Sequence, residues 1–209
     1  MYEADRLKKL PLYLFTIIDE SKARARAKGI DLIDLGMGNP DRPTARHIIQ
    51  KLIEGVNDSA NHRYSRPDNP VETEMRNAIA KWYMNRFGVT LDPKTEVLPL
   101  IGSKEGIVHL AMAVLNPGDI AIVPTPTYTV HIDSVIIAEG EVHNVTLKPE
   151  KGYRLDLNDI DEKVAKRAKI IYVSYPHNPT TATVDLSFFE KLVQWTRGKE
   201  IIICSDLAY

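Results

Sequence analysis

Five short apolar runs, most of them separated by stretches with helical periodicity, constrain the fold of this chain more than any other feature. The runs are Val97–Ile101, Ile120–Val123, Glu141–Leu147, Lys169–Ser174 and Ile201–Cys204, and the helical stretches are Lys104–Leu115, Thr127–Ala138, Asp156–Lys166 and Leu186–Arg197. Strands that alternate with helices are typical of βαβ units and a parallel sheet. Runs that are nearly all apolar indicate strands covered on both faces. We therefore expect an α/β fold with a largely parallel, doubly wound sheet and flanking helices.

The first 88 residues predict helices joined by polar connections. The expected elements are a helix at Leu12–Lys28, a short strand at Asp31–Leu35, a helix capped by Thr44 and running to Asn57, a long loop at Asp58–Pro70 and a helix at Val71–Phe87. Gly29 and Gly88 are expected to end the first and last of these helices, because glycine is the residue that most often terminates a helix.

Composition excludes several classes of function. Lys plus Arg is 27 and Asp plus Glu is 28, so the net charge is 27 − 28 = −1 over 209 residues. That balance gives no general electrostatic reason to expect a nucleic-acid or membrane partner. Cys204 is the single cysteine, which excludes a disulfide framework and favours a cytoplasmic setting. Residues 1–10 contain no apolar core of a secretory signal.

Several motifs of enzymes are missing from the sequence. The six histidines are scattered, with no H-E-x-x-H pattern and no pair of cysteines, so no metal site is expected. There is no G-x-S-x-G nucleophile elbow, no P-loop spacing and no G-x-G-x-x-G fingerprint.

Polar residues cluster where the expected strands end. Ser103 and Lys104 open a helix after the first run, Tyr128 follows the second, Asn178 follows the fourth, and Asp206 with Tyr209 follows the fifth. Ligands of open α/β sheets bind at the carboxyl ends of the strands. Each residue alone has an ordinary structural explanation: a helix cap, a packed ring or a turn before proline. Four such features at one edge are a stronger indication of a site.

These motifs, in this order, resemble the N-terminal portion of fold-type I pyridoxal-5′-phosphate (PLP) aminotransferases of class I/II, and most of all the alanine and LL-diaminopimelate branch. The resemblance covers nearly the whole chain. The residues that carry it are Leu12–Phe15, Asp34–Asp41, His62–Ser65, Ile101–Gly106, Pro124–Tyr128, His177–Pro179 and Ser205–Tyr209.

The resemblance implies a role for each matched residue. Ser103 and Lys104 would bind the phosphate of PLP, and Tyr128 would stack on its ring. Asn178 and Tyr209 would bind the phenolic oxygen, and Asp206 would pair with the pyridine nitrogen, which keeps the ring protonated as an electron sink.

Three further residues match positions outside those strand ends. Tyr64 would reach the cofactor phosphate of a neighbouring subunit, which implies a homodimer, and Tyr13 and Gly38 would contact substrate. The implied substrates are an amino acid and a 2-oxo acid. The implied domains are an N-terminal arm and small-domain segment, 1–40, and part of the PLP-binding large domain, 41–209.

Two departures from the family pattern stand out. Asn69 occupies a position where the family usually has glycine, and asparagine tolerates positive φ better than most residues. The family's Schiff-base lysine follows the Asp-x-x-Tyr element, and the sequence ends at Tyr209. We therefore expect a truncated N-terminal part of a longer enzyme, with the large domain incomplete at its C-terminus, no catalytic residue in this chain and no transamination by it alone.

Two alternatives remain open. The chain could be a cofactor-binding remnant without catalysis, a hypothesis that the missing lysine favours. It could also belong to an enzyme of the same fold that performs a different PLP reaction, such as elimination, decarboxylation or cyclisation, since these enzymes share the Asn, Asp and Tyr elements.

Overall fold

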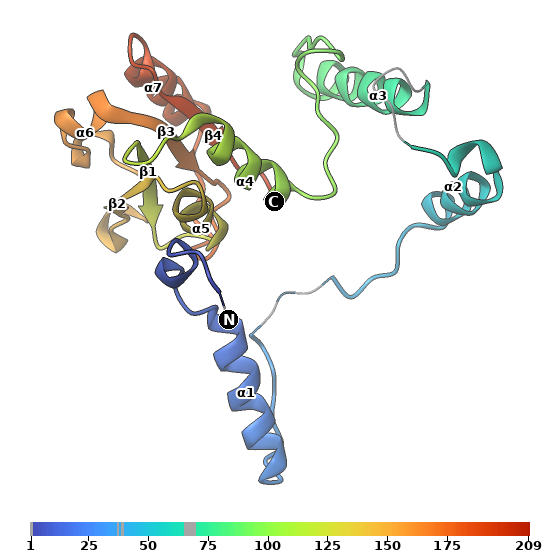
Figure 1. The fold of residues 1–209 in the computed structure, drawn as a ribbon, viewed down its shortest axis with the longest axis horizontal. Helices are drawn as coiled ribbons and strands as arrows, with labels where there is room; N and C mark the ends of the chain where they lie inside the picture. Colours follow the sequence, from blue (N-terminus) through green and yellow to red (C-terminus); the bar gives the residue numbers. More distant parts are fainter. Residues whose placement is uncertain (1, 37, 39, 65–69) are drawn as a thin grey trace. The chain divides into compact units, whose positions relative to one another are not determined.

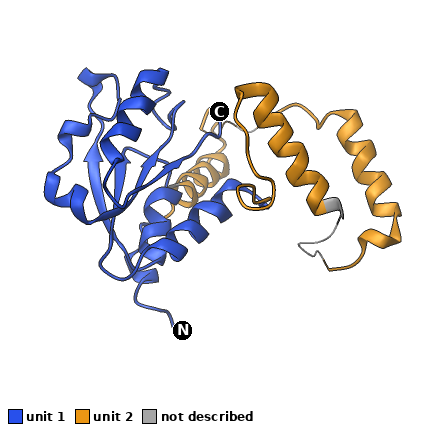
Figure 2. Ribbon diagram, turned by 90° about the horizontal axis from the view of Figure 1, so that it is seen from above, with its two compact units in different colours: residues 1–12, 100–209 blue, residues 13–99 orange. Residues whose placement is uncertain are grey.

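A computed structural model describes residues 2–36, 38, 40–64 and 70–209 of the chain. It divides into two compact units (Figure 2). The sheet unit comprises the segment up to Leu12 together with Leu100–Tyr209, and the helical unit comprises Tyr13–Pro99.

The sheet unit is built on four parallel strands in the order β2-β1-β3-β4 (Figure 1). The strands are β1 (Ile120–Thr125), β2 (Glu141–Thr146), β3 (Ala168–Val173) and β4 (Ile202–Ser205). The fold class expected from the sequence is confirmed. The order places β1 and β3 in the middle, where almost every side chain is buried.

Helices cover both faces of this sheet. The helices are α4 (Ser103–Val114), α5 (Val130–Ile137), α6 (Glu162–Arg167) and α7 (Leu186–Thr196). Successive side chains of β1 point to opposite faces of the sheet, as in any β-strand. Ile120 and Ile122 belong to a core with α6 and α7, whereas Ala121 and Val123 belong to a core with α4 and α5.

Short 3-10 turns complete the sheet unit. They are η1 (Leu7–Lys9), η3 (Pro149–Lys151) and η4 (Leu157–Asp159). The helix expected over Asp156–Lys166 is therefore two elements. The carboxylates of Asp156 and Asp161 each accept a hydrogen bond from the backbone two residues later, so the first begins η4 and the second begins α6.

The helical unit holds α1 (Leu14–Ala27), α2 (Arg46–Asn57), η2 (Ser59–Asn61) and α3 (Pro70–Phe87). The three expected helices are confirmed, but Thr44 is not the cap of α2. Ala45 occupies the N-cap position, and its side chain makes no capping hydrogen bond.

Two expected strands are wrong. Val97–Ile101 and Asp31–Leu35 form no strand. Nearby carboxylates instead accept hydrogen bonds from backbone N–H groups at or just after the ends of these segments. The Ile101 N–H donates to the carboxylate of Glu105 at 2.9 Å, and the Gly36 N–H donates to Asp34 at 3.0 Å. Such bonds compete with strand pairing where no neighbouring strand is in reach.

None of the helices in the described part of the chain has the length and apolar character required to span a bilayer.

Candidate functional site

The candidate site lies at the carboxyl ends of β1, β3 and β4 and at the start of α4, all within the sheet unit. Tyr128 follows β1, Asn178 follows β3, and Asp206 follows β4 directly. Because the strands are parallel, these ends meet at one edge of the sheet. The Asp206 N–H donates to the Val173 carbonyl at 2.8 Å, which ties the end of β4 to the end of β3.

Asp206 is held by a buried histidine. The Asp206 Oδ2 lies 3.1 Å from Nε2 of His131, and Nδ1 of the same ring lies 2.7 Å from Oγ1 of Thr127. A carboxylate only accepts hydrogen bonds, so His131 donates from Nε2, and a neutral ring then accepts from the Thr127 hydroxyl. The side chain of Asp206 is 9% exposed. The carboxylate is therefore buried and fixed in orientation.

His131 is itself fixed by its surroundings. Its ring stacks on Tyr172, with centroids 5.2 Å apart, and the Tyr172 hydroxyl lies 3.1 Å from that of Ser134. Burial raises the pKa of Tyr172 to about 12, so its phenol stays neutral. Sequence reasoning assigned no role to His131. The available signal was its place one helical turn after Thr127, on a segment that begins at a strand end.

Asn178 and Tyr209, which the resemblance assigns to one oxygen of the cofactor, are bonded to each other in the structure. The Asn178 amide donates from Nδ2 to the Tyr209 hydroxyl at 3.2 Å. The turn that carries Asn178 is closed by two backbone hydrogen bonds, from His177 to Ala182 at 2.8 Å and from Thr181 to His177 at 2.7 Å.

A buried imidazole anchors that turn. The His177 ring is buried, and its Nδ1 lies 2.8 Å from the Thr180 hydroxyl. Desolvation lowers the pKa of His177, with a smaller contribution from His131.

Ser103, Lys104 and Tyr128 form the third part of the site. Ser103 is the first residue of α4, and the Lys104 ammonium lies 5.0 Å from the centre of the Tyr128 ring. The first backbone N–H groups of a helix have no intrahelical acceptor, and the helix dipole favours an anion there. This end of the site is suited to an anionic group, and the Asp206 end to a cationic one.

Tyr13, Gly38 and Tyr64 belong to the helical unit. The Tyr64 side chain is 93% exposed, and the Tyr13 ring packs against Phe15 with centroids 5.4 Å apart. Space is open around the Gly38 α-carbon. Met37 and Asn39, which lie in the segment Asp34–Asp41 that resembles the aminotransferases, are outside the described residues. So are Ser65 and Asn69.

The described residues contain no group of three or more His, Cys, Asp or Glu side chains arranged to hold a metal ion.

Comparison with known proteins gives consistent matches. A family model described as aminotransferase class I and II matches residues 30–209. An LL-diaminopimelate aminotransferase of Syntrophobacter fumaroxidans is 47% identical over 99% of this chain and 53% of its own length. One from Aquifex aeolicus is also 47% identical, over 100% of this chain and 54% of its own length.

Solved structures agree with the sequence matches. The apo structure of BacF from Bacillus subtilis is 33% identical, with a TM-score of 0.89, over 99% of this chain and 52% of that protein. The chain thus spans about half the length of the relatives that it matches.

Proposed function

Because the chain belongs to the class I and II aminotransferase family, we propose that the protein transfers an amino group between an amino acid and a 2-oxo acid with PLP as cofactor. Enzymes of this family depend on PLP. The Asp206 carboxylate carries the proposal, because it is buried at the end of β4 and held by His131. A buried carboxylate is stabilised by a cationic partner, and a protonated pyridine nitrogen is one.

The other groups of the site fit a phosphorylated pyridine. The amide of Asn178 and the hydroxyl of Tyr209 supply donors for a ring oxygen, and Tyr128 supplies a ring face. Ser103 and Lys104 supply the first backbone N–H groups of α4 and a positive charge for a phosphate. The site therefore offers a complementary group to each polar part of PLP: the pyridine nitrogen, the ring oxygen and the phosphate.

Bound PLP supplies an electron sink for charge that develops at the substrate α-carbon. The residues of this chain bind and orient it. Asp206 keeps a proton on the ring nitrogen, and His131 keeps the Asp206 carboxylate in the orientation that this requires. Tyr128 sets the plane of the ring, and the start of α4 fixes the phosphate end.

The proposed substrates are amino acids of the alanine or glutamate type and their 2-oxo acids, with LL-diaminopimelate as a further candidate. The relatives named LL-diaminopimelate aminotransferase support that candidate. Tyr13 and Gly38 would contact substrate. Tyr64 would reach the cofactor of a partner subunit in a homodimer. The proposed location of the protein is the cytoplasm.

We assign residues 1–40 to an N-terminal arm and small-domain segment, and residues 41–209 to the PLP-binding large domain. In the 209-residue chain the family's lysine, which follows the Asp-x-x-Tyr element, has no counterpart. That lysine anchors the cofactor and moves the substrate α-proton. We therefore propose that these 209 residues alone bind the cofactor without transaminase activity.

The first experiment measures the affinity of the purified chain for PLP by ultrafiltration. Asp206→Ala should weaken binding by at least about ten-fold, since it removes the charged partner of the ring nitrogen. The matched control is Asp119→Ala, which removes a carboxylate just before β1, bonded to Asn116. Equal affinity of Asp206→Ala and the unmodified chain would contradict the assignment, as would an equal loss in Asp119→Ala.

A second experiment separates binding from catalysis. The chain is mixed with PLP, reduced with borohydride and weighed intact. We expect no stoichiometric adduct, and a single adduct mapped to one lysine would overturn the proposal that the chain is inactive. The transaminase proposal is tested on a form of the protein that contains the family's lysine. Bound PLP whose absorbance does not respond to alanine, glutamate or LL-diaminopimelate would exclude that reaction with those donors.

A further inference from the structure

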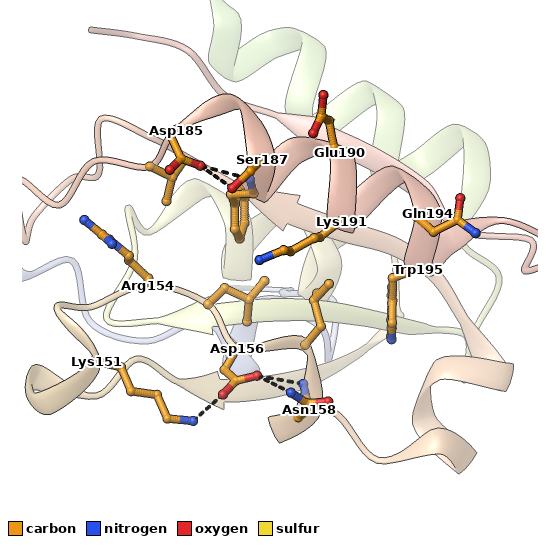
Figure 3. Close-up of a pocket in the computed structure, with 14 residues that line it drawn as sticks. Lys151, Arg154, Asp156, Asn158, Asp185, Ser187, Glu190, Lys191, Gln194 and Trp195 are labelled. Carbon is orange, nitrogen blue, oxygen red and sulfur yellow. Dashed lines mark hydrogen bonds and ion pairs between the residues drawn. The ribbon is translucent and has the colours of Figure 1, made fainter.

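A cavity lies in the sheet unit, apart from the residues assigned above. It has a volume of about 980 Å³ and lies between α7 and the segment 151–158 (Figure 3). None of the candidate site residues lines it. The volume falls within the range of pockets that bind small organic molecules, roughly 300–1,000 Å³.

Apolar and aromatic side chains form much of its wall. Leu155 is buried, and Phe188 and Trp195 are half-buried on α7, where they pack against the core on that face of the sheet. One face of the Trp195 ring is also in contact with a cation, because the Lys199 ammonium lies over it, 4.7 Å from the ring centre. The cavity thus offers a fixed aromatic ring to an apolar ligand group.

Some charged side chains around the cavity have hydrogen-bond or ion-pair partners, and Lys191 has none among the described residues. Asp156 pairs with Lys151 at 2.6 Å, and Asp185 accepts hydrogen bonds from the Ser187 hydroxyl and the Phe188 N–H at the start of α7. In contrast, Lys191 has no hydrogen bond or ion pair with any described residue. Figure 3 shows Lys191 extending across the cavity from α7, whereas Glu190 points away.

We propose that this cavity binds a small organic anion with an aromatic or branched apolar body. The anionic group faces Lys191 on α7, with Arg154 on the opposite wall formed by the segment 151–158, and the apolar body lies against Trp195 and Phe188. A carboxylate or phosphate receives a charge-assisted hydrogen bond from a lysine, and this bond is stronger than one between neutral groups.

The wall of this cavity is bonded to the turn that carries Asn178. The Tyr175 hydroxyl donates to the Tyr153 carbonyl at 3.2 Å and accepts from the Leu155 N–H at 2.8 Å. Arg154 Nε donates to the Thr183 carbonyl at 3.1 Å. A ligand held by Arg154 therefore acts on both ends of that turn. This regulatory consequence rests on the function proposed for Asn178, whereas the binding itself does not.

The test uses the two tryptophans as separate reporters. The chain contains Trp82 in the helical unit and Trp195 at the cavity, so indole 15N labelling gives two signals, assigned with Trp82→Phe. Phenylacetate is the probe, in the absence of PLP. We expect it to shift the Trp195 signal saturably and to leave the Trp82 signal in place.

Charge is tested with matched probes and variants. Neutral phenylacetamide and the variant Lys191→Gln should each weaken binding by about ten-fold, the loss of one charge-assisted hydrogen bond. The control Lys166→Gln removes an equal charge on α6, outside the cavity, and should leave the affinity unchanged.

A Trp195 signal that does not move would overturn the proposal. So would equal affinity for phenylacetamide, or an affinity unaffected by Lys191→Gln. Because PLP is absent throughout, a failure here leaves the function proposed for Asp206 untouched, and the reverse also holds.

Discussion

Both units of the chain contain elements with strong apolar patterns, but only those of the sheet unit are buried. In the sheet unit Ile122 is fully buried, and its neighbours along β1 fill cores on both faces of the sheet. In the helical unit α2 carries an equally clear apolar face, yet Leu52 is 67% exposed and no residue of α2 is buried. An amphipathic pattern specifies an element, whereas burial also requires a complementary surface. The βαβ connections of the sheet unit supply that surface within one stretch of sequence.

The largest expected effect compares one buried and one exposed residue. Ile122→Ala should lower the free energy of unfolding of the sheet unit by about 2–5 kcal/mol, through lost burial and the cavity left behind. Leu52→Ala should change it by less than about 0.5 kcal/mol, as surface substitutions usually do. Urea unfolding followed by circular dichroism measures both. A loss in Leu52→Ala as large as that in Ile122→Ala would show that the face of α2 is packed in solution.

A second comparison concerns tyrosine hydroxyls. Tyr175→Phe removes the acceptor of the buried Leu155 N–H and should cost about 1–3 kcal/mol of stability. Tyr64→Phe in the helical unit removes an exposed hydroxyl and should be neutral to within about 0.5 kcal/mol. The same urea series measures both variants. If Tyr175→Phe proves neutral, water satisfies the Leu155 N–H, and the cavity wall is looser than the structure shows.

The sheet unit was largely predictable, because four apolar runs alternate with helices and pair with each other. Their strand bounds agree with the structure to within about two residues at each end, the usual limit at element ends. The run Val97–Ile101 has the same composition but finds no neighbouring strand among the described residues, and the Ile101 side chain is 97% exposed. The composition of an apolar segment does not determine whether it pairs with a strand, or with which one.

The candidate site shows the same limit. Asn178 and Asp206 could be located because each follows a strand end in sequence. His131 could not be assigned to Asp206, because their hydrogen bond joins residues 75 positions apart. Only the parallel arrangement of β1 and β4 around β3 brings the two side chains together.

A third comparison concerns histidines and pH. Burial lowers the pKa of His177 below the ordinary value of 6.5, so the unfolded chain takes up a proton before the folded chain does. The free energy of unfolding should therefore fall as the pH drops below about 6.5 and continue to fall until folded His177 is protonated. The stability difference between the unmodified chain and His177→Gln should shrink from pH 8 to pH 5.

The control for this comparison is His47→Gln on α2. It removes an exposed imidazole, so the pH dependence of stability should be that of the unmodified chain. Parallel pH profiles for the unmodified chain and His177→Gln would mean that the imidazole at position 177 is solvated in solution.

The smallest expected effect compares two left-handed positions. Thr181, in the turn that carries Asn178, has φ of +62°, which a β-branched residue rarely adopts, and Gly29 at the end of α1 has φ of +73°. Thr181→Gly should stabilise the sheet unit by roughly 0.5–1 kcal/mol, because relief of strain exceeds the added flexibility of the unfolded chain. Gly29→Ala should instead destabilise α1 by about 1 kcal/mol, although space is open around it, because only the backbone conformation opposes the methyl group. Urea unfolding reports the first variant, and helix content by circular dichroism the second. A destabilised Thr181→Gly would show that the Thr181 side chain contributes more to the turn than its backbone conformation costs.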